Sequence, residues 1–251
     1  MSDCKEIKLL PEMKEVWQET LNWSPSDRQL KLFQDLYAEI LKGNSQFNLT
    51  RITDRLDFWE KHLWDSLAGL IYLRETQLKD LQQPNRAIDI GTGAGFPGIP
   101  VGIFSEAIEV TLLDSTRKKI TFLEDLIIKL QLNNCHALAG RAEEIGQNKH
   151  HRQFYDLAFV RAVGKAAVAA EYALPLLRIG GLAVLYRGHW QDEETLALEA
   201  AATQLGGKID RIANFITPLS NSVRNCIYLR KIEPTSDRFP RRSGIPAQKP
   251  L

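Results

Sequence analysis

The sequence has few cysteines and histidines, and neither residue type is spaced as in a metal site. Its three cysteines, Cys4, Cys135 and Cys226, lie far apart and form no CxxC pair. An odd number of cysteines at such spacing argues against both a disulfide framework and a zinc site. The five histidines show no HxxxH or HExxH spacing. We therefore expect no bound metal.

Long hydrophobic runs are also absent. No stretch approaches the roughly 20 apolar residues that a membrane-spanning helix needs, and the first residues, MSDCKE, lack the apolar core of a secretion signal. With 251 residues, 44% of them hydrophobic and 25% charged, the chain can nevertheless bury a full core. We expect a globular, cytoplasmic protein that acts as a monomer and has no membrane partner.

Charge is balanced over the chain as a whole but not along it. Its 32 lysines and arginines and 31 acidic residues give a net charge of +1, which by itself indicates no nucleic-acid partner. Residues 238–251, however, hold four basic residues and no acid, which leaves −3 for the rest of the chain. The basic residues are Arg238, Arg241, Arg242 and Lys249. We expect this proline-rich tail to be extended and to bind RNA phosphates, with packing against the acidic body as the alternative.

The first 80 residues predict a helical cap. Ser24-Pro25-Ser26-Asp27 combines a capping serine, a proline at the first helical position and an acid in the first turn, and apolar residues follow at helical spacing. Gly43-Asn44 predicts the end of this helix. A second helix is expected to begin at Thr53-Asp54. Its apolar face is expected to consist of Leu56, Trp59, Leu63, Leu67 and Leu70.

From about residue 84, short apolar strands alternate with helices, a pattern typical of parallel βαβ units. Parallel strands are expected near residues 86–90, 109–113, 136–139, 155–160 and 182–186, with helices at 118–130 and 193–205 among the connections. Segments 211–216 and 226–231 are too close for a crossover helix, so they are expected to pair antiparallel at the sheet edge. The sequence predicts a doubly wound α/β sheet over residues 81–235, between a helical cap (1–80) and a basic tail (236–251).

A glycine loop, Gly91-Thr92-Gly93-Ala94-Gly95, follows the first predicted strand. Glycines there allow a tight turn and a close approach of a ligand to the backbone. About twenty residues further on, Asp114 ends the second strand, where its carboxylate can accept both hydroxyls of a ribose. The two features together indicate a cofactor that contains adenosine.

Three observations favour S-adenosylmethionine over NAD, although residues 93–98 also match GxGxxG. Asp89, at the end of the strand before the loop, suits an ammonium group and would repel a pyrophosphate. Bulky Phe96 stands where the third glycine of the dinucleotide motif would allow close helix packing. The antiparallel pair that closes the sheet is more typical of methyltransferases.

Several segments, in order along the chain, resemble the GidB/RsmG family of small-subunit ribosomal RNA methyltransferases. They are residues 89–100 (DIGTGAGFPGIP), 112–115 (LLDS) with Lys118-Lys119, 140–143 (GRAE), Arg161-Ala162, and, nearer the ends, 47–50 (FNLT), 62–67 (HLWDSL) and 239–251 (FPRRSGIPAQKPL). The similarity runs from about residue 44 to the last residue, and the first forty residues match weakly. The resemblance implies a class I, Rossmann-like methyltransferase fold.

The resemblance also implies a reaction and a site. The reaction is methyl transfer from S-adenosylmethionine to N7 of a guanine in the decoding-region loop of 16S ribosomal RNA, with that RNA or the small ribosomal subunit as partner. The expected cofactor-binding residues, including those of the glycine loop, are Asp89, Gly91, Thr92, Gly93, Phe96, Asp114, Ser115, Thr116, Ala142, Glu143 and, at the mouth of the site, Arg161. The candidates for contact with RNA are Arg117, Lys118, Lys119, Arg241, Arg242 and Lys249.

The chemistry of the fourth strand end agrees with a ring nitrogen as the acceptor. Guanine N7 has a free lone pair and no proton, so its methylation needs alignment and no general base. An exocyclic amine would favour an Asp/Asn-Pro-Pro-aromatic motif where this chain has Val160-Arg161-Ala162-Val163. Methylation at a pyrimidine C5 would need a cysteine in this region, and none of the three lies there.

Each candidate has a structural alternative. Asp114 could cap the helix that begins at Ser115, Phe96 could belong to the core, and Arg161 could pair with an acid such as Asp89. His62 and Asp65 lie three residues apart on a predicted helix, which indicates a local hydrogen bond. Two other functions also remain open, namely a small-molecule methyltransferase and a non-catalytic RNA-binding module that holds the cofactor.

Overall fold

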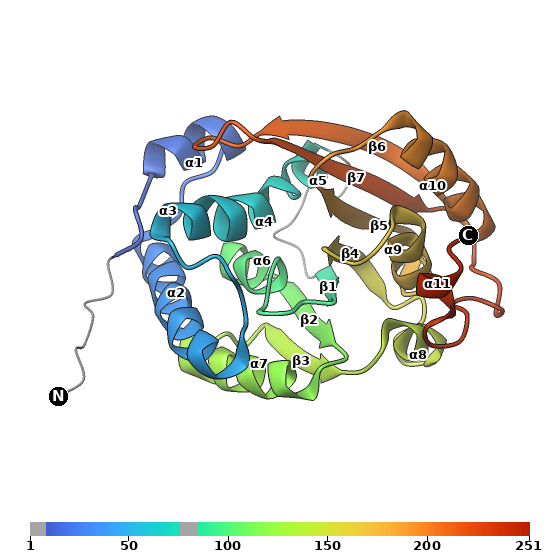
Figure 1. Ribbon diagram of the computed structural model, residues 1–251, viewed down its shortest axis with the longest axis horizontal. Coiled ribbons are helices and arrows are strands. Elements are labelled where there is room, and N and C mark those ends of the chain that lie inside the picture. The colour runs from blue at the N-terminus through green and yellow to red at the C-terminus, as the bar shows by residue number, and fades with distance from the viewer. Residues whose placement is uncertain (1–8, 76–84) are drawn as a thin grey trace.

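The computed structural model describes residues 9–75 and 85–251, and these form a seven-stranded sheet with helices on both faces (Figure 1). The strand order is β3-β2-β1-β4-β5-β7-β6. The strands are β1 (Asn85–Ile90), β2 (Ile108–Asp114), β3 (Cys135–Ala139), β4 (Tyr155–Arg161), β5 (Leu177–Arg187), β6 (Gly207–Ile216) and β7 (Val223–Lys231). The first five pair in parallel, whereas β7 pairs antiparallel with β5 and β6. The predicted doubly wound sheet with an antiparallel edge pair is confirmed.

Two of the strands, β5 and β6, begin at least four residues earlier than predicted. β5 begins at Leu177, five residues before the expected start, and β6 begins at Gly207. Within β5, Gly180 has a φ of +84°, and the register with β4 shifts between Tyr155 and Leu157. Glycines and a bulge interrupt the apolar alternation, so the early part of β5 carries no recognisable strand pattern.

The helices between the strands divide into two groups. The first group, α6 (Gly98–Phe104) and α7 (Arg117–Leu130), packs on one face of the sheet. The second, α8 (Ala142–Gln147), α9 (Ala166–Ala173) and α10 (Asp192–Gln204), covers the other face. Alternate residues of one strand therefore enter different cores, as Ala87 and Ile88 of β1 do.

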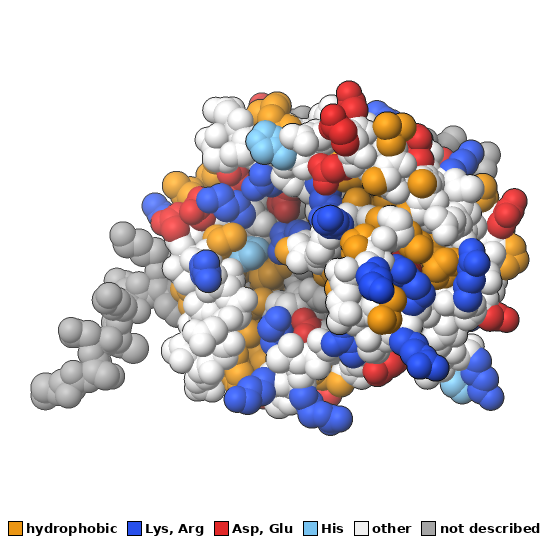
Figure 2. All heavy atoms as spheres, turned by 45° about the vertical axis from the view of Figure 1, so that its right-hand side comes forward, with side chains coloured by type: hydrophobic (Ala, Val, Ile, Leu, Met, Phe, Trp, Pro, Cys, Tyr) orange, Lys and Arg blue, Asp and Glu red, His pale blue; other side chains and the backbone are white. Residues whose placement is uncertain are grey.

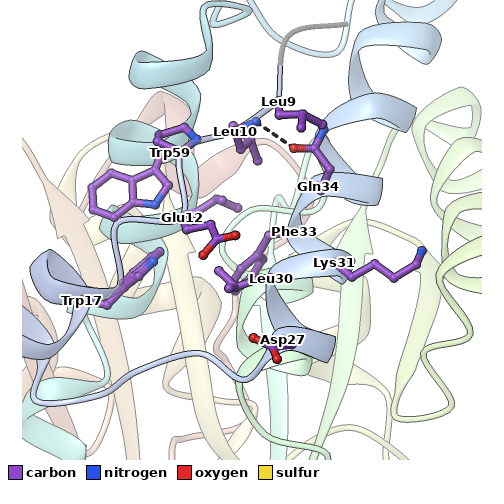
Figure 3. A pocket seen from close by; sticks show the side chains of 12 residues that line it. Leu9, Leu10, Glu12, Trp17, Asp27, Leu30, Lys31, Phe33, Gln34 and Trp59 are labelled. Carbon is purple, nitrogen blue, oxygen red and sulfur yellow. Dashed lines mark hydrogen bonds between the residues drawn. The ribbon is translucent and has the colours of Figure 1, made fainter.

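Helices before β1 extend the first of these cores. They are α1 (Lys14–Leu21), α2 (Asp27–Phe47), α3 (Arg55–Phe58), the π-helical turn η1 (Trp59–Trp64), α4 (Asp65–Ala68) and α5 (Ile71–Glu75), and they lie mostly at the left and top of Figure 1. Trp17 and Trp59 pack with their ring centroids 4.7 Å apart. Beside them, segment 9–12, α1, α2 and η1 line an open pocket of about 320 Å³ (Figure 3). Leu10 N donates to Gln34 Oε1 across its rim at 2.7 Å.

The boundaries predicted for α2 were wrong at both ends. The helix is capped by Ser26, which forms a capping box with Gln29, so Pro25 lies before the helix. It continues through Gly43 to Phe47 and ends with Asn48 in the left-handed conformation. Gly43 is buried where a Cβ atom would collide with the ring of Phe122 on α7. This glycine makes room for a neighbouring helix and does not end its own.

The second predicted helix does begin after Asp54, which accepts from Leu56 N and Asp57 N. Leu56 was wrongly assigned to the apolar face, because 43% of its surface is exposed. From Phe58 onward this segment is buried on most sides, including the polar Glu60, so a single apolar face does not describe it. No helix within the described ranges combines the length and apolar character needed to cross a membrane.

Candidate functional site

The glycine loop lies where the order of the parallel strands reverses. β1 pairs with β2 on one side and with β4 on the other, and ligands of such sheets bind outside the carboxyl ends of the strands at this point. Gly91 and Gly93 have φ angles of +72° and +61°. A Cβ at Gly91 would lie 2.8 Å from Val163 Cγ2, whereas at Gly93 the nearest atom would be Gly91 O at 3.9 Å. Gly93 therefore borders open space that a ligand can enter.

Asp89, near the end of β1, holds this loop by hydrogen bonds. Its Oδ2 accepts from Thr92 Oγ1 at 2.6 Å and from Gly98 N at 2.8 Å. The carboxylate is fully buried, and its Oδ1 has no hydrogen-bond partner among the described residues. Burial raises the pKa of Asp89 to about 6, against the opposing effect of its hydrogen bonds with Thr92 and Gly98. One oxygen of this buried carboxylate is therefore left without a hydrogen-bond partner among the described residues, and Asp89 itself is not among the residues that line the adjacent cleft.

Asp114 connects the end of β2 to the same loop. Its Oδ2 accepts from Gly93 N at 3.0 Å, and its Oδ1 accepts from Thr116 N at 2.8 Å. Lys119 Nζ lies 3.6 Å from Oδ2. The cap residue of α7 is Thr116, so Asp114 is not the N-cap, although it does accept one backbone hydrogen there. Each carboxylate oxygen keeps a lone pair for a further donor.

A cleft of about 270 Å³ opens beside Asp114. It brings together six of the residues expected at the cofactor, namely Gly91, Asp114, Ser115, Thr116, Ala142 and Glu143. It is also lined by Leu113, Lys119, Gly140, Arg141, Val163 and Tyr172. Five of the lining residues, Leu113, Gly140, Arg141, Val163 and Tyr172, were not among those expected at the cofactor or the RNA. Tyr172 lies within α9, so no motif at a strand end could indicate it. The beginning of α8, with Ala142 and Glu143, forms another wall of the cleft.

On that wall, Glu143 is buried and receives three hydrogen bonds at Oε1. The donors are Gly244 N at 2.8 Å, Arg141 Nη2 at 3.2 Å and Tyr172 Oη at 3.2 Å. Burial alone would raise the pKa of Glu143, but the hydrogen bonds from Gly244 and Arg141 outweigh it and lower the pKa. Burial and the nearby Glu143 carboxylate raise the pKa of Tyr172 to about 12, so its hydroxyl remains a donor.

Phe96 lies under the N-terminal helices. Only 4% of its surface is exposed, and its ring stacks on His62 at 4.2 Å with an interplanar angle of 5°. Phe58 packs edge-on against the same ring at 5.6 Å. The residue is part of the core, and the cleft lining does not include it.

Arg161, at the end of β4, joins the sheet to the π-helical turn. Its Nη1 donates to Lys61 O at 2.9 Å and to Asp65 Oδ2 at 3.2 Å, so its acidic partner is Asp65 and the expected alternative, Asp89, was wrong. Its Nη2 lies 3.3 Å from His62 Nδ1. His62 and Asp65 thus share Arg161, in place of the local hydrogen bond expected between them. Asp65 Oδ1 also lies 3.4 Å from Arg224 Nε.

His62 is neutral in this arrangement. Burial and the positive charge of Arg161 lower its pKa to about 3. A neutral ring that accepts from Arg161 at Nδ1 carries its proton on Nε2, which then donates to Thr50 Oγ1 at 2.9 Å. π-helical turns recur at functional sites, and here η1 places a neutral acceptor beside the arginine.

The candidate RNA-binding cations fall into two groups. Arg117, Lys118, Arg242 and Lys249 are exposed. Lys119 and Arg241, in contrast, have acidic partners. Lys119 Nζ lies 3.6 Å from Asp114 Oδ2, and Arg241 forms two-pronged hydrogen bonds with the fully buried Glu171 of α9. Figure 2 shows Lys and Arg side chains spread over the face that comes forward when the right-hand side of Figure 1 is turned to the viewer. In the part of the chain that the structure describes, no cluster of three or more His, Cys, Asp or Glu residues is placed to hold a metal ion.

Comparison with known proteins identifies the family. The GidB family model, described as rRNA small subunit methyltransferase G, matches residues 29–223. A ribosomal RNA small subunit methyltransferase G from Nostoc sp. PCC 7120 is 57% identical over 243 residues, which cover 97% of this chain and 99% of the relative. The chain belongs to this family. Another relative of that name, from Trichodesmium erythraeum, is 52% identical and covers 98% of this chain and 96% of its own.

Solved structures show that the fold is that of class I S-adenosylmethionine-dependent methyltransferases. A 16S rRNA adenine-N(1)-methyltransferase from Catenulisporales acidiphilia matches with a TM-score of 0.51 and 13% identity, covering 61% of this chain and 88% of its own. A branched-chain polyamine synthase from Thermus thermophilus matches with a TM-score of 0.55 and 13% identity, covering 68% and 56%. These two names describe different chemistries, so the fold alone does not decide the reaction.

Proposed function

We propose that this GidB family member transfers the methyl group of S-adenosylmethionine to N7 of a guanine in the decoding-region loop of 16S ribosomal RNA. Its sequence identity to methyltransferases named for the small ribosomal subunit, over nearly the whole chain, carries the proposal. We further propose that it acts as a monomer in the cytoplasm. The geometry of the cleft supports the cofactor, and the exposed cations support the RNA.

The cleft fits an adenosine that carries a cationic amino-acid tail. Asp114 keeps free lone pairs beside the open space at Gly93, where ribose hydroxyls can donate. Ser115 and Thr116 extend that wall, and Ala142 with Glu143 form the wall proposed for the adenine. Asp89 Oδ1, buried and without a partner among the described residues, suits an ammonium group and not a pyrophosphate. Thr92, which donates to the other oxygen of Asp89, holds the loop in place for both.

For this reaction the protein must position the two reactants, and no proton transfer to a general base is needed. The bound cofactor supplies an electrophilic methyl group, and guanine N7 supplies a lone pair that bears no proton. Alignment of two such reactants can lower the barrier by roughly 7 to 11 kcal/mol. We propose that Arg161, which Asp65 and Lys61 O hold at the end of β4, lies at the mouth of the site and takes part in this alignment by contacting substrate or cofactor. Phe96 fixes the loop by stacking on His62.

For RNA binding we propose two exposed groups of cations. Arg117 and Lys118 lie in the first turn of α7, immediately after the cleft residues Ser115 and Thr116, with Lys119 next to them at the cleft. Arg242 and Lys249 lie on the C-terminal segment. Arg241 is left out of this proposal, because its guanidinium is already held by a buried carboxylate.

Incubation with labelled S-adenosylmethionine and small ribosomal subunits that lack the modification tests the proposed function. We expect transfer to one guanine of 16S ribosomal RNA, and mapping of the methylated base identifies it. Parallel reactions with naked 16S RNA and with assembly intermediates identify the form of the substrate. Transfer to another position or base would contradict the proposal.

Two other outcomes would support the rival functions. Transfer to a small metabolite, with none to RNA, would make the chain a small-molecule methyltransferase. Binding of S-adenosylhomocysteine and of RNA without any transfer would make it a non-catalytic module. Tight binding of NAD with no response to S-adenosylhomocysteine in titration calorimetry would overturn the cofactor assignment itself.

A further inference from the structure

The C-terminal segment, residues 239–251, packs against the protein body beside the cleft wall. It lies next to α8 and α9 in Figure 1 and includes a single helical turn, α11 (Ile245–Gln248), where the sequence analysis expected only extended chain. Its Phe239 is buried, and Phe239 O accepts from Arg152 Nη1 at 2.8 Å. Pro240 O accepts from Gln147 Nε2 at 2.9 Å. The segment is therefore attached at its beginning by packing and by hydrogen bonds.

Two buried carboxylates hold the middle of this segment. Glu171 of α9 is fully buried and accepts from the backbone N of Arg241 at 2.8 Å, from its Nε at 2.9 Å and from its Nη2 at 2.6 Å. Three residues later, Gly244 N donates to Oε1 of Glu143 at 2.8 Å. The two carboxylates are also linked through the chain, because Tyr172, which follows Glu171, donates to the same Oε1. Arg241, Glu171, Tyr172, Glu143 and Gly244 form one closed network.

This network reaches the cleft through Glu143. Glu143, Arg141 and Tyr172 all line the cleft, whereas Arg241 and Gly244 do not. A carboxylate that accepts three hydrogen bonds at one oxygen has its orientation set by the donors. The hydrogen bond from Gly244 N is the shortest of the three, and Gly244 lies about 100 residues away from Glu143 in the sequence. The position of this wall therefore depends on the docked C-terminal segment.

We propose that the C-terminal segment acts as a latch for the cofactor site, in which the ion pair of Arg241 with Glu171 places Gly244 N on Glu143. Arg241 is thus a positioning residue that never touches the cofactor. This inference rests on the proposed function, since it assigns the wall of Glu143 to the adenosine of the cofactor.

Burial explains why Arg241 performs this role in place of binding RNA. The side chain of Glu171 has no exposed surface, and Arg241 is 23% exposed. Withdrawing the arginine toward a phosphate would leave an uncompensated charge inside the protein, which is strongly unfavourable. Arg242, the next residue, is exposed and can meet a phosphate at no such cost. The adjacent residues Arg241 and Arg242 thus have different functions, the first in docking the segment and the second in binding RNA.

The affinity of the full-length protein for S-adenosylhomocysteine, measured by titration calorimetry well below the melting temperature, tests the latch. We expect Arg241→Ala to raise the Kd at least tenfold. We expect Arg241→Lys, which keeps a charge near Glu171 but loses the two-pronged geometry, to raise it by a smaller factor. The matched control is Arg242→Ala, which changes the neighbouring arginine and should leave the Kd within twofold of wild type. Arg241→Lys also keeps the test valid if Arg241→Ala does not fold.

Steady-state kinetics add a readout that loss of stability alone would not produce. In Arg241→Lys we expect a higher KM for S-adenosylmethionine, with kcat retained at saturating cofactor. Folded Arg241 variants with wild-type Kd would overturn the latch, and so would variants that lose only RNA affinity. A wild-type protein that binds no S-adenosylhomocysteine would instead reject the proposed function.

Discussion

The two walls of the cleft are built from different kinds of partners. In the wall formed by the glycine loop, Asp89 bonds Thr92 and Gly98, and Asp114 bonds Gly93 and Thr116, with separations of 2 to 21 residues. In the wall formed by α8 and α9, Glu171 bonds Arg241 and Glu143 bonds Gly244, with separations of 70 and 101 residues. The first wall is held by contacts between residues close in the sequence, whereas the second also needs distant segments to dock.

Among the substitutions, the largest effect on stability is expected where the second wall loses a charge. Arg241→Ala should lower the free energy of unfolding by about 3 to 5 kcal/mol, because it leaves the fully buried Glu171 unpaired. Urea denaturation measures the change. In the double variant Arg241→Ala with Glu171→Leu, removal of the buried charge should restore part of the loss. Strictly additive effects in this cycle would mean that the two side chains do not interact.

In the first wall, the loss should appear in binding. Asp114→Ala should weaken the binding of S-adenosylhomocysteine by roughly 1.5 to 3 kcal/mol, because a charged acceptor for paired hydroxyls is removed. Calorimetry gives the affinity, and circular dichroism checks the fold. If a well-folded variant binds as tightly as wild type, Asp114 serves only to hold Gly93 and Thr116.

Acid should weaken the packing behind the first wall. The pKa of His62 is about 3 in the folded protein and near 6.5 when unfolded. The unfolded chain therefore binds the proton first, and the free energy of unfolding should fall as the pH drops from 6.5 toward 3, by up to about 1.4 kcal/mol per unit.

The variant His62→Gln isolates this contribution, since the other titrating groups remain. Its unfolding free energy, measured by urea denaturation across the same pH range, should depend less steeply on pH than that of the wild type. Identical pH dependence in the two proteins would contradict a buried neutral His62.

The smallest effect should come from the exposed cations of the C-terminal segment. Arg242→Ala and Lys249→Ala should each reduce the salt dependence of RNA binding by about one unit of slope, because each removes one phosphate contact. Filter binding at several salt concentrations measures the slope, and the melting temperature should not change. An unchanged slope in both variants would limit the RNA interface to other parts of the protein.

The predicted ends of helices and strands show which features of the fold the sequence patterns can and cannot predict. The alternation of strands and helices, the glycine loop and Asp114 all depend on residues close in sequence, and they predicted the sheet and the order of its elements. The end of α2 was missed because Gly43 resembles a helix terminus, while its actual role is to accommodate Phe122 of α7. A glycine has the same appearance in a sequence whether it faces solvent or another helix.

For the docking of the C-terminal segment on the second wall, the available signal was a single glutamate. Glu171 stands alone among the alanines and other apolar residues of α9, and a carboxylate in such a helix is buried only with a partner. The position of Glu171 in an apolar helix indicates that it has a basic partner. It does not indicate which basic residue of the tail is that partner. Likewise, the sequence did not indicate which acid pairs with Arg161. The docking of the π-helical turn places Asp65, and not Asp89, beside its guanidinium.

The sequence by itself determined the class of fold and the glycine loop of the proposed cofactor site, because period, turn chemistry and strand-end acids act over short distances, and its motifs indicated the family. Only the tertiary structure decided which charges pair, which tautomer His62 adopts and whether the basic tail is free or docked. The physical reason is burial. Where water is excluded, an ion or a ring nitrogen can be satisfied only by the protein group that the fold places beside it. In this protein that exclusion occurs between segments up to about 100 residues apart.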